Sequence, residues 1–311
     1  MKPFRLALAM AICTVPLTAA NAQTGAPEIE TIASYPHGQF LENLDMAAGG
    51  SVIVTSYVDQ RLLRWPGSGE VETFAQLDVH PVGVLAQPGR IIVSAHGASF
   101  TGGPDFTKTN QLLVLDPDGV LQRRVMAPQA LFLNGMTALD EDHILIADSL
   151  AGMIWLFRPS SGEILPWLEH PLLAVAAPTD QRPGANGLKM RDGALYVSNS
   201  SRGAIYRVRL DGLEPAGEVE QFARTGPVDD FTYLPDGAIA AATHGERLIR
   251  VDPDGTVSDI MREGCDACTS VMLATDRSLL VTTSGNLLEG GDAPARLLRI
   301  PPSSHPGSGE Q

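Results

Sequence analysis

The stretch ANGLKMRDGALYVSNS, residues 185–200, contains two short apolar strands joined by a tight turn. The turn is RDG (191–193), and residues of these types supply the backbone conformations that join antiparallel strands. An Asn-Gly pair stands before the first strand, rather than in the turn where such a pair would be ordinary. The same arrangement occurs in LNGMTALDEDHILIADS (133–149), with Asn134 at the start of its strand. Two hairpins built alike predict a structural repeat.

The hairpin recurs six times along the chain, and each copy is followed by a third short strand. These third strands are RLLRW (61–65), LLVL (112–115), MIWLF (153–157), AIYRV (204–208), RLIRV (247–251) and RLLRI (296–300). After most of them comes a Gly- or Asp-rich turn and an amphipathic fourth strand. Short alternating runs between such turns are typical of strands, and no segment has a sustained helical period. Units of roughly 40–50 residues with four strands each are typical of β-propeller blades.

The sixth unit lacks its own fourth strand, because RLLRI runs into a polar tail at residues 303–311. Near the other end of the chain, IETIAS (29–34) matches the fourth strands VETFAQ (71–76) and VEQFAR (219–224). An N-terminal strand that completes the last blade would remove an exposed sheet edge. We therefore expect an all-β fold over residues 23–302: a six-bladed β-propeller with four strands per blade, closed by the N-terminal strand.

The first 22 residues have the features of a secretory signal peptide. Lys2 and Arg5 precede an apolar run (6–17), and ANA (20–22) forms a small-residue cleavage site. The apolar run is too short to span a bilayer. A buried N-terminal helix is the alternative. We therefore expect a soluble, exported bacterial protein, periplasmic or secreted, without membrane insertion.

Charge limits the partners of this chain. The formal net charge is −14, and it becomes about −16 without the signal segment, which carries two positive charges and no negative one. No basic cluster with interleaved aromatic residues is present, which argues against nucleic acid as a partner. An acidic protein attracts cations, although most of this charge is expected on the solvated surface. A small molecule is the expected ligand, and a monomer is the default state.

Two cysteines remain after the signal segment, Cys265 and Cys268 in GCDACTS (264–270). In an oxidising compartment such a pair is expected to form a short-loop disulfide. A thioredoxin-like redox pair is the alternative, but the βαβ context that it requires is not visible.

The residues that begin the first strands are candidates for a shared site, because the first strand of every propeller blade lines the central channel. Aligned on their hairpins, these residues are Glu42, Val82, Asn134, Asn186, Asp229 and Thr269. The fifth unit aligns only to within one residue, so Asp230 is an alternative to Asp229. Carboxylates and carboxamides without imidazole or thiolate favour Ca²⁺, with Mg²⁺ and Zn²⁺ as alternatives. The competing explanation is that Asn and Asp begin strands by bonding nearby backbone.

These residues carry a resemblance to the SMP-30/gluconolactonase/LRE-like family of six-bladed propellers, many of which are Ca²⁺-dependent lactonases. The matching motifs are FLENLDM with Glu42, FLNGMTAL with Asn134, GANGLKM with Asn186, and PVDDFTY with Asp229 and Asp230. The resemblance implies that these side chains bind the metal and that Asn134 and Asp229 also serve catalysis. Sugar-lactone members carry an Arg where this chain has Phe132. That departure points to a less polar ligand.

The resemblance thus implies a metal-dependent lactonase or esterase acting on a fairly apolar small molecule. The cation would polarise the carbonyl, Asp229 would activate water, and Glu42 would be chiefly a ligand. An exported binding protein without turnover and a non-hydrolytic enzyme on the same scaffold are the alternatives. A serine hydrolase of the α/β type is disfavoured because no Gly-x-Ser-x-Gly motif occurs.

The second strands are expected to end on the same face as these residues. Substrate-pocket candidates are therefore Phe132, Tyr57, His96, Asp148, Asn199 and His244. Either histidine among them is a candidate proton shuttle. The Gly- and Pro-containing stretch 96–110 lies inside the second unit, where we expect a long loop on one face.

Overall fold

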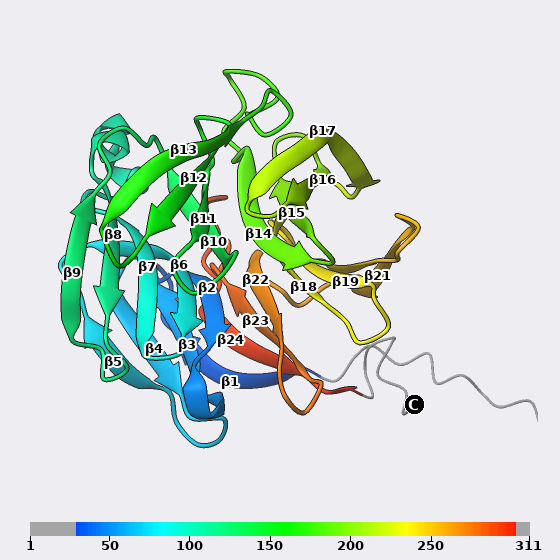
Figure 1. Cartoon of the computed structure of the whole chain (residues 1–311). Helices are drawn as coiled ribbons and strands as arrows, with labels where there is room; N and C mark the ends of the chain where they lie inside the picture. Colours follow the sequence, from blue (N-terminus) through cyan, green and yellow to red (C-terminus); the bar gives the residue numbers. More distant parts are fainter. Residues whose placement is uncertain (1–28, 303–311) are drawn as a thin grey trace, which may run out of the picture.

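The computed structural model describes residues 29–302, apart from the side chain of Pro104, and forms a six-bladed β-propeller (Figure 1). Six antiparallel sheets of four strands surround a central axis, which confirms the predicted fold class. The predicted signal segment (1–22) and the tail (303–311) lie outside the described residues.

Each blade runs from an inner strand at the axis to an outer strand at the rim. Blade 1 contains β2 (Leu41–Met46), β3 (Val52–Ser56), β4 (Arg61–Trp65) and β5 (Glu72–Gln76), and blade 2 contains β6 (His80–Gln87), β7 (Arg90–His96), β8 (Asn110–Leu115) and β9 (Leu121–Met126). Blade 3 contains β10 (Leu133–Ala138), β11 (Ile144–Asp148), β12 (Met153–Arg158) and β13 (Glu163–Glu169), and blade 4 contains β14 (Ala185–Arg191), β15 (Ala194–Asn199), β16 (Ala204–Asp211) and β17 (Glu214–Arg224). Blade 5 contains β18 (Val228–Tyr233), β19 (Ile239–Thr243), β20 (Leu248–Val251) and β21 (Val257–Met261). Blade 6 contains β22 (Cys268–Leu273), β23 (Leu279–Thr283), β24 (Ala295–Ile300) and β1 (Glu30–Tyr35).

The ring closes where the two ends of the described chain meet. Strand β1 pairs antiparallel with β24, from Glu30 opposite Arg299 to Tyr35 opposite Ala295 (Figure 1). An ion pair between Glu30 and Arg299 adds to this pairing. The predicted completion of the last blade by the N-terminal strand is therefore confirmed.

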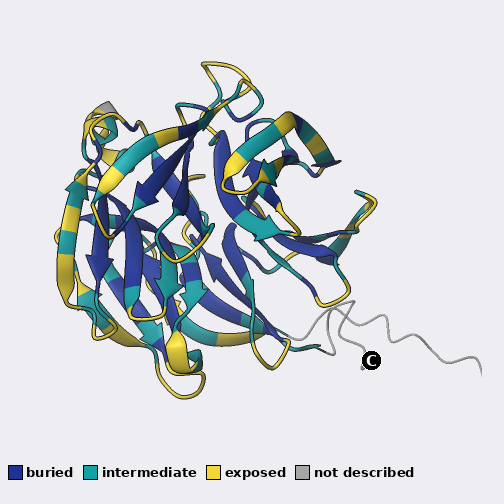
Figure 2. Cartoon of the chain, in the orientation of Figure 1, coloured by how far each residue is buried: buried dark blue, intermediate teal, exposed yellow. Residues whose placement is uncertain are grey.

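The core consists of apolar layers between neighbouring blades. Successive side chains of a strand point to opposite faces of its sheet, so Val52 and Val54 pack toward blade 6 while Ile53 packs toward blade 2. Six buried apolar clusters follow this rule, one at each blade boundary. The inner strands are accordingly buried and the outer strands are partly exposed (Figure 2). These apolar contacts between neighbouring sheets hold the inner strands at fixed positions around the axis.

Helical structure among residues 29–302 is limited to three short 3₁₀ segments, namely η1 (Ala48–Gly50), η2 (Phe100–Gly102) and η3 (Pro104–Lys108). In that part of the chain no helix has the length and apolar character needed to cross a membrane. Both η2 and η3 belong to the long connection between β7 and β8, the loop expected from the sequence at residues 96–110.

Candidate functional site

The pairing between first and second strands is interrupted at the same point in all six blades. The register shifts directly after Leu41, Pro81, Leu133, Ala185, Val228 and Cys268. Such bulges bend a strand and redirect side chains. The first residue released from pairing in each blade is the one that the sequence aligned around the channel. We call these six residues the first ring: Glu42, Val82, Asn134, Asn186, Asp229 and Thr269.

The bulges allow neighbouring inner strands to approach closely at the axis. A Cβ atom added to Gly135 would lie 2.6 Å from the carbonyl oxygen of Asn186, and one added to Gly187 would lie 2.4 Å from Oδ1 of Asp230. No side chain fits at either place, because real Cβ atoms do not approach other atoms so closely. Glycine after Asn134 and Asn186 therefore brings these two amides beside the next blade. This explains the Asn-Gly pairs at the strand starts.

Asp229 is the best-connected carboxylate of the first ring. Its Oδ1 accepts a hydrogen bond of 2.6 Å from Nδ2 of Asn186, and its Oδ2 lies 3.4 Å from Nδ1 of His244. The other ring nitrogen of His244 lies 2.9 Å from Oγ of Ser200, whose own proton is donated to the carbonyl of Val228. His244 Nε2 is therefore the donor to Ser200, and Nδ1 is left to share a proton with Asp229.

The electrostatic environment of Asp229 and Glu42 favours the binding of protons or of a cation. Burial, together with the charges of Glu42 and Asp230, raises the pKa of Asp229 well above its usual value. Burial and the charge of Asp230 likewise raise the pKa of Glu42 to about 8. Burial lowers the pKa of His244 to about 4, so its ring is neutral at pH 7. Acidic groups crowded in a dry site retain protons unless a cation replaces them.

Asp230 occupies a different environment from its neighbour Asp229. Its Oδ1 lies 2.6 Å from Nζ of Lys189, and its Oδ2 accepts bonds from Ser270 Oγ at 2.7 Å and Asn43 Nδ2 at 3.1 Å. These partners come from blades 4, 6 and 1, so one carboxylate of blade 5 links four blades. Asp230 takes the position that Gly135 and Gly187 occupy in their blades, one residue beyond the first ring.

The first ring provides oxygen atoms suited to a hard cation. Oε2 of Glu42 is buried and has no hydrogen-bond partner among the described residues. The amide nitrogens of Asn134 and Asn186 are used in bonds to Ser149 and Asp229, and within residues 29–302 no hydrogen bond reaches their amide oxygens. Two carboxylates and two amide oxygens form a donor set that Ca²⁺ accepts. The described chain contains no group of three or more His, Cys, Asp or Glu side chains arranged for a metal ion.

A second ring follows the ends of the second strands. Leu133 is paired with Asp148 and Ala185 with Asn199, so the next residue in each blade lies beside the first ring. These residues are Tyr57, His96, Ser149, Ser200, His244 and Ser284. Sequence reasoning named Tyr57, His96 and His244 but missed Ser149, Ser200 and Ser284. The alignment of SY, AH, DS, NS, TH and TS at the ends of these strands was the available signal.

Two pocket candidates, Asp148 and Asn199, are not brought into these rings. Asp148 is fully buried and accepts bonds from the backbone of Leu131 and Phe132 and from Nε1 of Trp155. Asn199, also fully buried, donates to three successive carbonyls of residues 172–174. Both side chains hold loops in place and have no surface facing the channel.

Three of the four remaining pocket candidates, Phe132, Tyr57 and His96, belong to one aromatic group. Phe132 contacts the ring of His96 edge-on, with 4.6 Å between ring centroids, and Tyr57 lies 6.1 Å from the same histidine. Phe100 and Phe106 of the β7–β8 loop join this group. The structure therefore places apolar rings over blades 1 to 3, and the polar pair Asp229 and His244 at blade 5.

Cys265 and Cys268 are joined by a disulfide, with their Cα atoms 5.2 Å apart. The four-residue loop that they close leads directly into Thr269 of the first ring.

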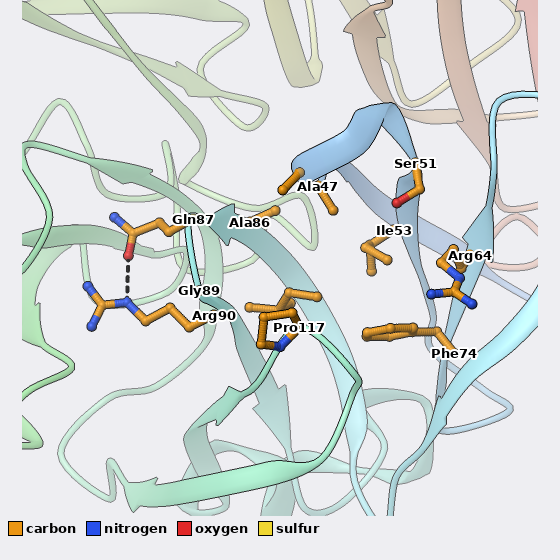
Figure 3. A pocket seen from close by; sticks show the side chains of 12 residues that line it. Ala47, Ser51, Ile53, Arg64, Phe74, Ala86, Gln87, Gly89, Arg90 and Pro117 are labelled. Atoms are coloured by element: carbon orange, nitrogen blue, oxygen red, sulfur yellow. Dashed lines mark hydrogen bonds between the residues drawn. The ribbon is translucent and has the colours of Figure 1, made fainter.

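A separate cavity opens on the other face of the propeller, between blades 1 and 2 (Figure 3). It has a volume of about 110 Å³ and is lined by the strand-connecting turns, including Arg64, Phe74 and Pro117. Arg90 donates from Nε to Oε1 of Gln87 at its edge, at 2.9 Å (Figure 3). None of the candidate site residues lines this cavity.

Comparison with known proteins places this arrangement among similar propellers. No protein-family model matches the chain. A "Putative hetero-Diels-Alderase" from Phoma sp is 26% identical over 301 residues, covering 82% of this chain and 85% of that protein. Among solved structures, a luciferin-regenerating enzyme has a TM-score of 0.68 at 16% identity, covering 89% of this chain and 95% of its own.

Two further structures extend the comparison. A gluconolactonase from Xanthomonas campestris has a TM-score of 0.65 at 16% identity, with 88% of this chain and 90% of that chain covered. The calcium-binding protein regucalcin from Agrobacterium tumefaciens has a TM-score of 0.59 at 16% identity, with 86% and 95% covered. At these identities the likeness is one of fold. The resemblance to the SMP-30/gluconolactonase/LRE-like family is confirmed at the level of the fold, a six-bladed propeller.

Proposed function

We propose that this protein is a metal-dependent hydrolase that opens a lactone, or cleaves an ester, of a fairly apolar small molecule. The observation that best supports this proposal is the position of Asp229, whose Oδ1 lies 2.6 Å from Asn186 Nδ2 and whose Oδ2 lies 3.4 Å from His244 Nδ1. A carboxylate beside a neutral imidazole is an arrangement that can take a proton from water. The gluconolactonase from Xanthomonas campestris, which shares the fold, supports this reaction class.

The four oxygen-bearing side chains of the first ring, Glu42, Asn134, Asn186 and Asp229, are the residues that would hold the metal. A hard divalent cation, with Ca²⁺ as our first choice, would polarise the substrate carbonyl and stabilise negative charge on its oxygen. The buried, unpartnered Oε2 of Glu42 supports a ligand role for that residue. The calcium-binding protein regucalcin, a neighbour in fold, supports the choice of ion.

The proton transfers would be carried by Asp229 and His244. Water attacks the carbonyl carbon as one of its protons passes to this pair, and the same proton then goes to the ring oxygen as the lactone opens. The side chain of His244 is 24% exposed while that of Asp229 is 6% exposed, so the imidazole is the member that can exchange protons with solvent. Ser200 Oγ accepts a hydrogen bond from Nε2–H of His244 and fixes the orientation of the ring.

The direct test is hydrolysis of a panel of alkyl and aryl lactones by the purified protein, followed by titration of the released acid before and after EDTA. EDTA-sensitive turnover that Ca²⁺ restores is the expected result. Ca²⁺ binding without turnover on the whole panel would instead indicate an exported binding protein. Absence of both binding and turnover would leave the aligned Asn and Asp residues with a purely structural role.

A non-hydrolytic reaction on the same scaffold is the second candidate. The relative from Phoma sp, whose name refers to a cycloaddition, supports it, as does the group of aromatic rings beside the first ring. The two candidates differ in whether water enters the product. Reaction in ¹⁸O-labelled water, with mass spectrometry of the product, separates them, because only hydrolysis incorporates the label.

We also propose that the protein works as an exported monomer on small molecules, without nucleic-acid or membrane partners. The acidic net charge of −14 supports this. The disulfide between Cys265 and Cys268 suits an oxidising compartment. Osmotic-shock fractionation of the source cells and light scattering of the mature chain test the two parts separately.

A further inference from the structure

The connection between β7 and β8 carries two phenylalanines into the aromatic group beside the first ring. Phe100 belongs to η2 and Phe106 to η3. The centroid of the Phe106 ring lies 5.4 Å from that of Phe132 and 5.5 Å from that of His96. The Phe100 ring lies 5.7 Å from Phe132 and 4.5 Å from Tyr57. We call the three rings of Phe100, Phe106 and Phe132 the aromatic wall.

The loop that carries the wall is tied to the propeller by specific bonds. The backbone N–H of Phe100 donates to Oη of Tyr57 at 2.9 Å. Inside the loop, Ala98 N donates to Oγ1 of Thr109 at 3.0 Å, and that hydroxyl donates to the carbonyl of Phe106 at 2.7 Å. Both phenylalanines are thus held in place before any ligand arrives, and a preformed surface loses little entropy on binding.

The wall remains partly open to solvent although its rings would be more stable in a core. All three phenylalanines are only partly buried. Leu131, which precedes Phe132 of the wall, is 42% exposed, and Leu150, which follows Ser149 of the second ring, is 37% exposed. Exposed apolar side chains at the edge of a polar site are a common feature of ligand-binding pockets.

Beneath the wall lies a polar atom without a partner. His96 is fully buried, and its Nε2 makes no hydrogen bond with the described residues. The backbone of Leu133 acts on this ring and raises its pKa, against the larger lowering by burial. Tyr57 Oη accepts from Phe100 N–H and lies 3.4 Å from Nδ1 of His96. When Tyr57 donates to Nδ1, the hydrogen of the neutral imidazole is on Nε2. An unpaired buried N–H donor is rare and indicates a missing acceptor.

We propose that the aromatic wall binds a flat, aryl-type portion of the substrate, and that a ring of the wall turns aside so that Nε2–H of His96, buried in the free protein, donates to one of the substrate's oxygens. The location of the reacting carbonyl rests on the proposed function. Phe132 of the wall and Asn134 of the first ring lie two residues apart at the start of β10, so the wall lies next to the candidate metal site. We choose an aryl group because aromatic rings prefer the edge-on and offset geometries that the rings of the wall present. The substrate class is therefore an aryl-bearing lactone or ester with an oxygen that accepts a hydrogen bond.

The test separates binding from turnover with an unreactive probe. 3,4-Dihydro-2-quinolinone is the lactam counterpart of the aryl-fused lactone 3,4-dihydrocoumarin, and its binding can be measured by calorimetry. Phe106→Leu and Phe100→Leu keep apolar volume but remove the ring. Phe222→Leu is the matched control, because Phe222 is also partly buried and packs on Tyr196 of blade 4.

We expect each wall variant to weaken lactam binding by about tenfold, as the loss of one aromatic contact does. His96→Phe should have a similar effect because it keeps a ring and removes the donor, and Phe222→Leu should have none. Thermal unfolding of each variant shows whether it is folded. In parallel, the ratio of kcat/KM for 3,4-dihydrocoumarin over δ-valerolactone should fall in the wall variants.

The possible failures are distinguishable. Lactam binding that is absent in the wild type, or unchanged in folded wall variants, overturns the inference even if δ-valerolactone is hydrolysed. Lactam binding that depends on the wall, in a protein that hydrolyses neither lactone, upholds the inference and rejects the hydrolase.

Discussion

Asn186 donates a hydrogen bond of 2.6 Å from Nδ2 to Oδ1 of Asp229, across the boundary between the fourth and fifth blades. The two residues are far apart in sequence and meet because both begin an inner strand at a bulge. The amide nitrogen restrains the carboxylate, and the amide oxygen is left without a hydrogen bond from residues 29–302. One bond therefore orients two oxygen donors of the candidate metal site.

Asn186→Ala and Asp229→Ala should each abolish cation binding and leave the propeller folded. Loss of a ligand is expected to reduce Ca²⁺ affinity by about 100-fold or more, equivalent to about 3 kcal/mol. Calorimetric titration with Ca²⁺ measures this, and far-UV circular dichroism reports on the fold. The exposed Asp118→Ala is the control, since Asp118 lies on a turn of blade 2. Full affinity in either variant would remove that residue from the site.

Asp230→Asn should act on stability rather than on cation binding. Asp230 is bonded to Lys189, Ser270 and Asn43, so the change weakens contacts among four blades. Removing a charged acceptor from such a network costs about 1–3 kcal/mol. Urea unfolding should show a lower midpoint, while the folded variant still binds Ca²⁺. Unchanged stability combined with lost Ca²⁺ binding would make Asp230, rather than Asp229, the fifth-blade ligand.

The architecture could be predicted from the sequence because its signals are local and repeated. Each hairpin carries its own turn residues and alternation, and IETIAS can be matched to other fourth strands without knowing the fold. The order of the first-ring residues around the axis then follows from the order of the blades. This is why Glu42, Asn134 and Asn186 could be aligned at once.

The details that the sequence left open depend on contacts between blades. Asp229 and Asp230 are the same residue type side by side in the sequence, and contacts with other strands distinguish them, such as Lys189 beside Asp230 and His244 beside Asp229. The second ring begins one residue beyond the last paired residue of each second strand, so Ser149 and Ser200 contact Asn134 and Asn186 where Asp148 and Asn199 were expected. The contact of Phe100 with Tyr57 joins two loops of different blades, so no local pattern could indicate it.

The raised pKa of Glu42 predicts a pH-dependent stability of the metal-free protein. Burial and the charge of Asp230 raise this pKa from 4.5 to about 8. Between these values the folded state keeps a proton that the unfolded state releases, so the free energy of unfolding should fall as pH rises. Glu42→Gln removes this contribution. In EDTA the variant should therefore be more stable than the wild type at pH 8, and the difference should shrink toward pH 4.5.

Urea unfolding at both pH values measures this effect. Ca²⁺ should stabilise the wild type at pH 8 by binding only its folded state, and should stabilise Glu42→Gln much less. A wild type that matches the variant in EDTA at pH 8 would show that Glu42 is already ionised without a metal.

His244→Gln should reduce hydrolysis while leaving Ca²⁺ affinity nearly unchanged. His244 lies 3.4 Å from Asp229 through Nδ1 but supplies no oxygen to the metal site. Loss of a positioned acid–base group reduces kcat by about 10²–10⁴-fold. His143→Gln is the control, because His143 is bonded to Asp140 in the β10–β11 turn of blade 3. Equal kcat in the two variants would exclude His244 from the proton transfer.

Phe132→Arg should shift substrate preference toward polar and acidic lactones. Phe132 packs against His96, Phe100 and Phe106, so a guanidinium at this place adds a charge and removes a ring from the aromatic wall. Arg binds carboxylates and polar oxygens through its planar array of N–H donors. We expect kcat/KM for D-glucono-δ-lactone to rise relative to that for 3,4-dihydrocoumarin, by about tenfold or more if one charged hydrogen bond is gained. Phe132→Leu separates the two effects, because it removes the ring without adding charge and should lower only the aryl lactone. If neither variant changes the ratio of the two substrates, Phe132 does not contact the substrate, and the apolar side of the pocket must be formed by other residues.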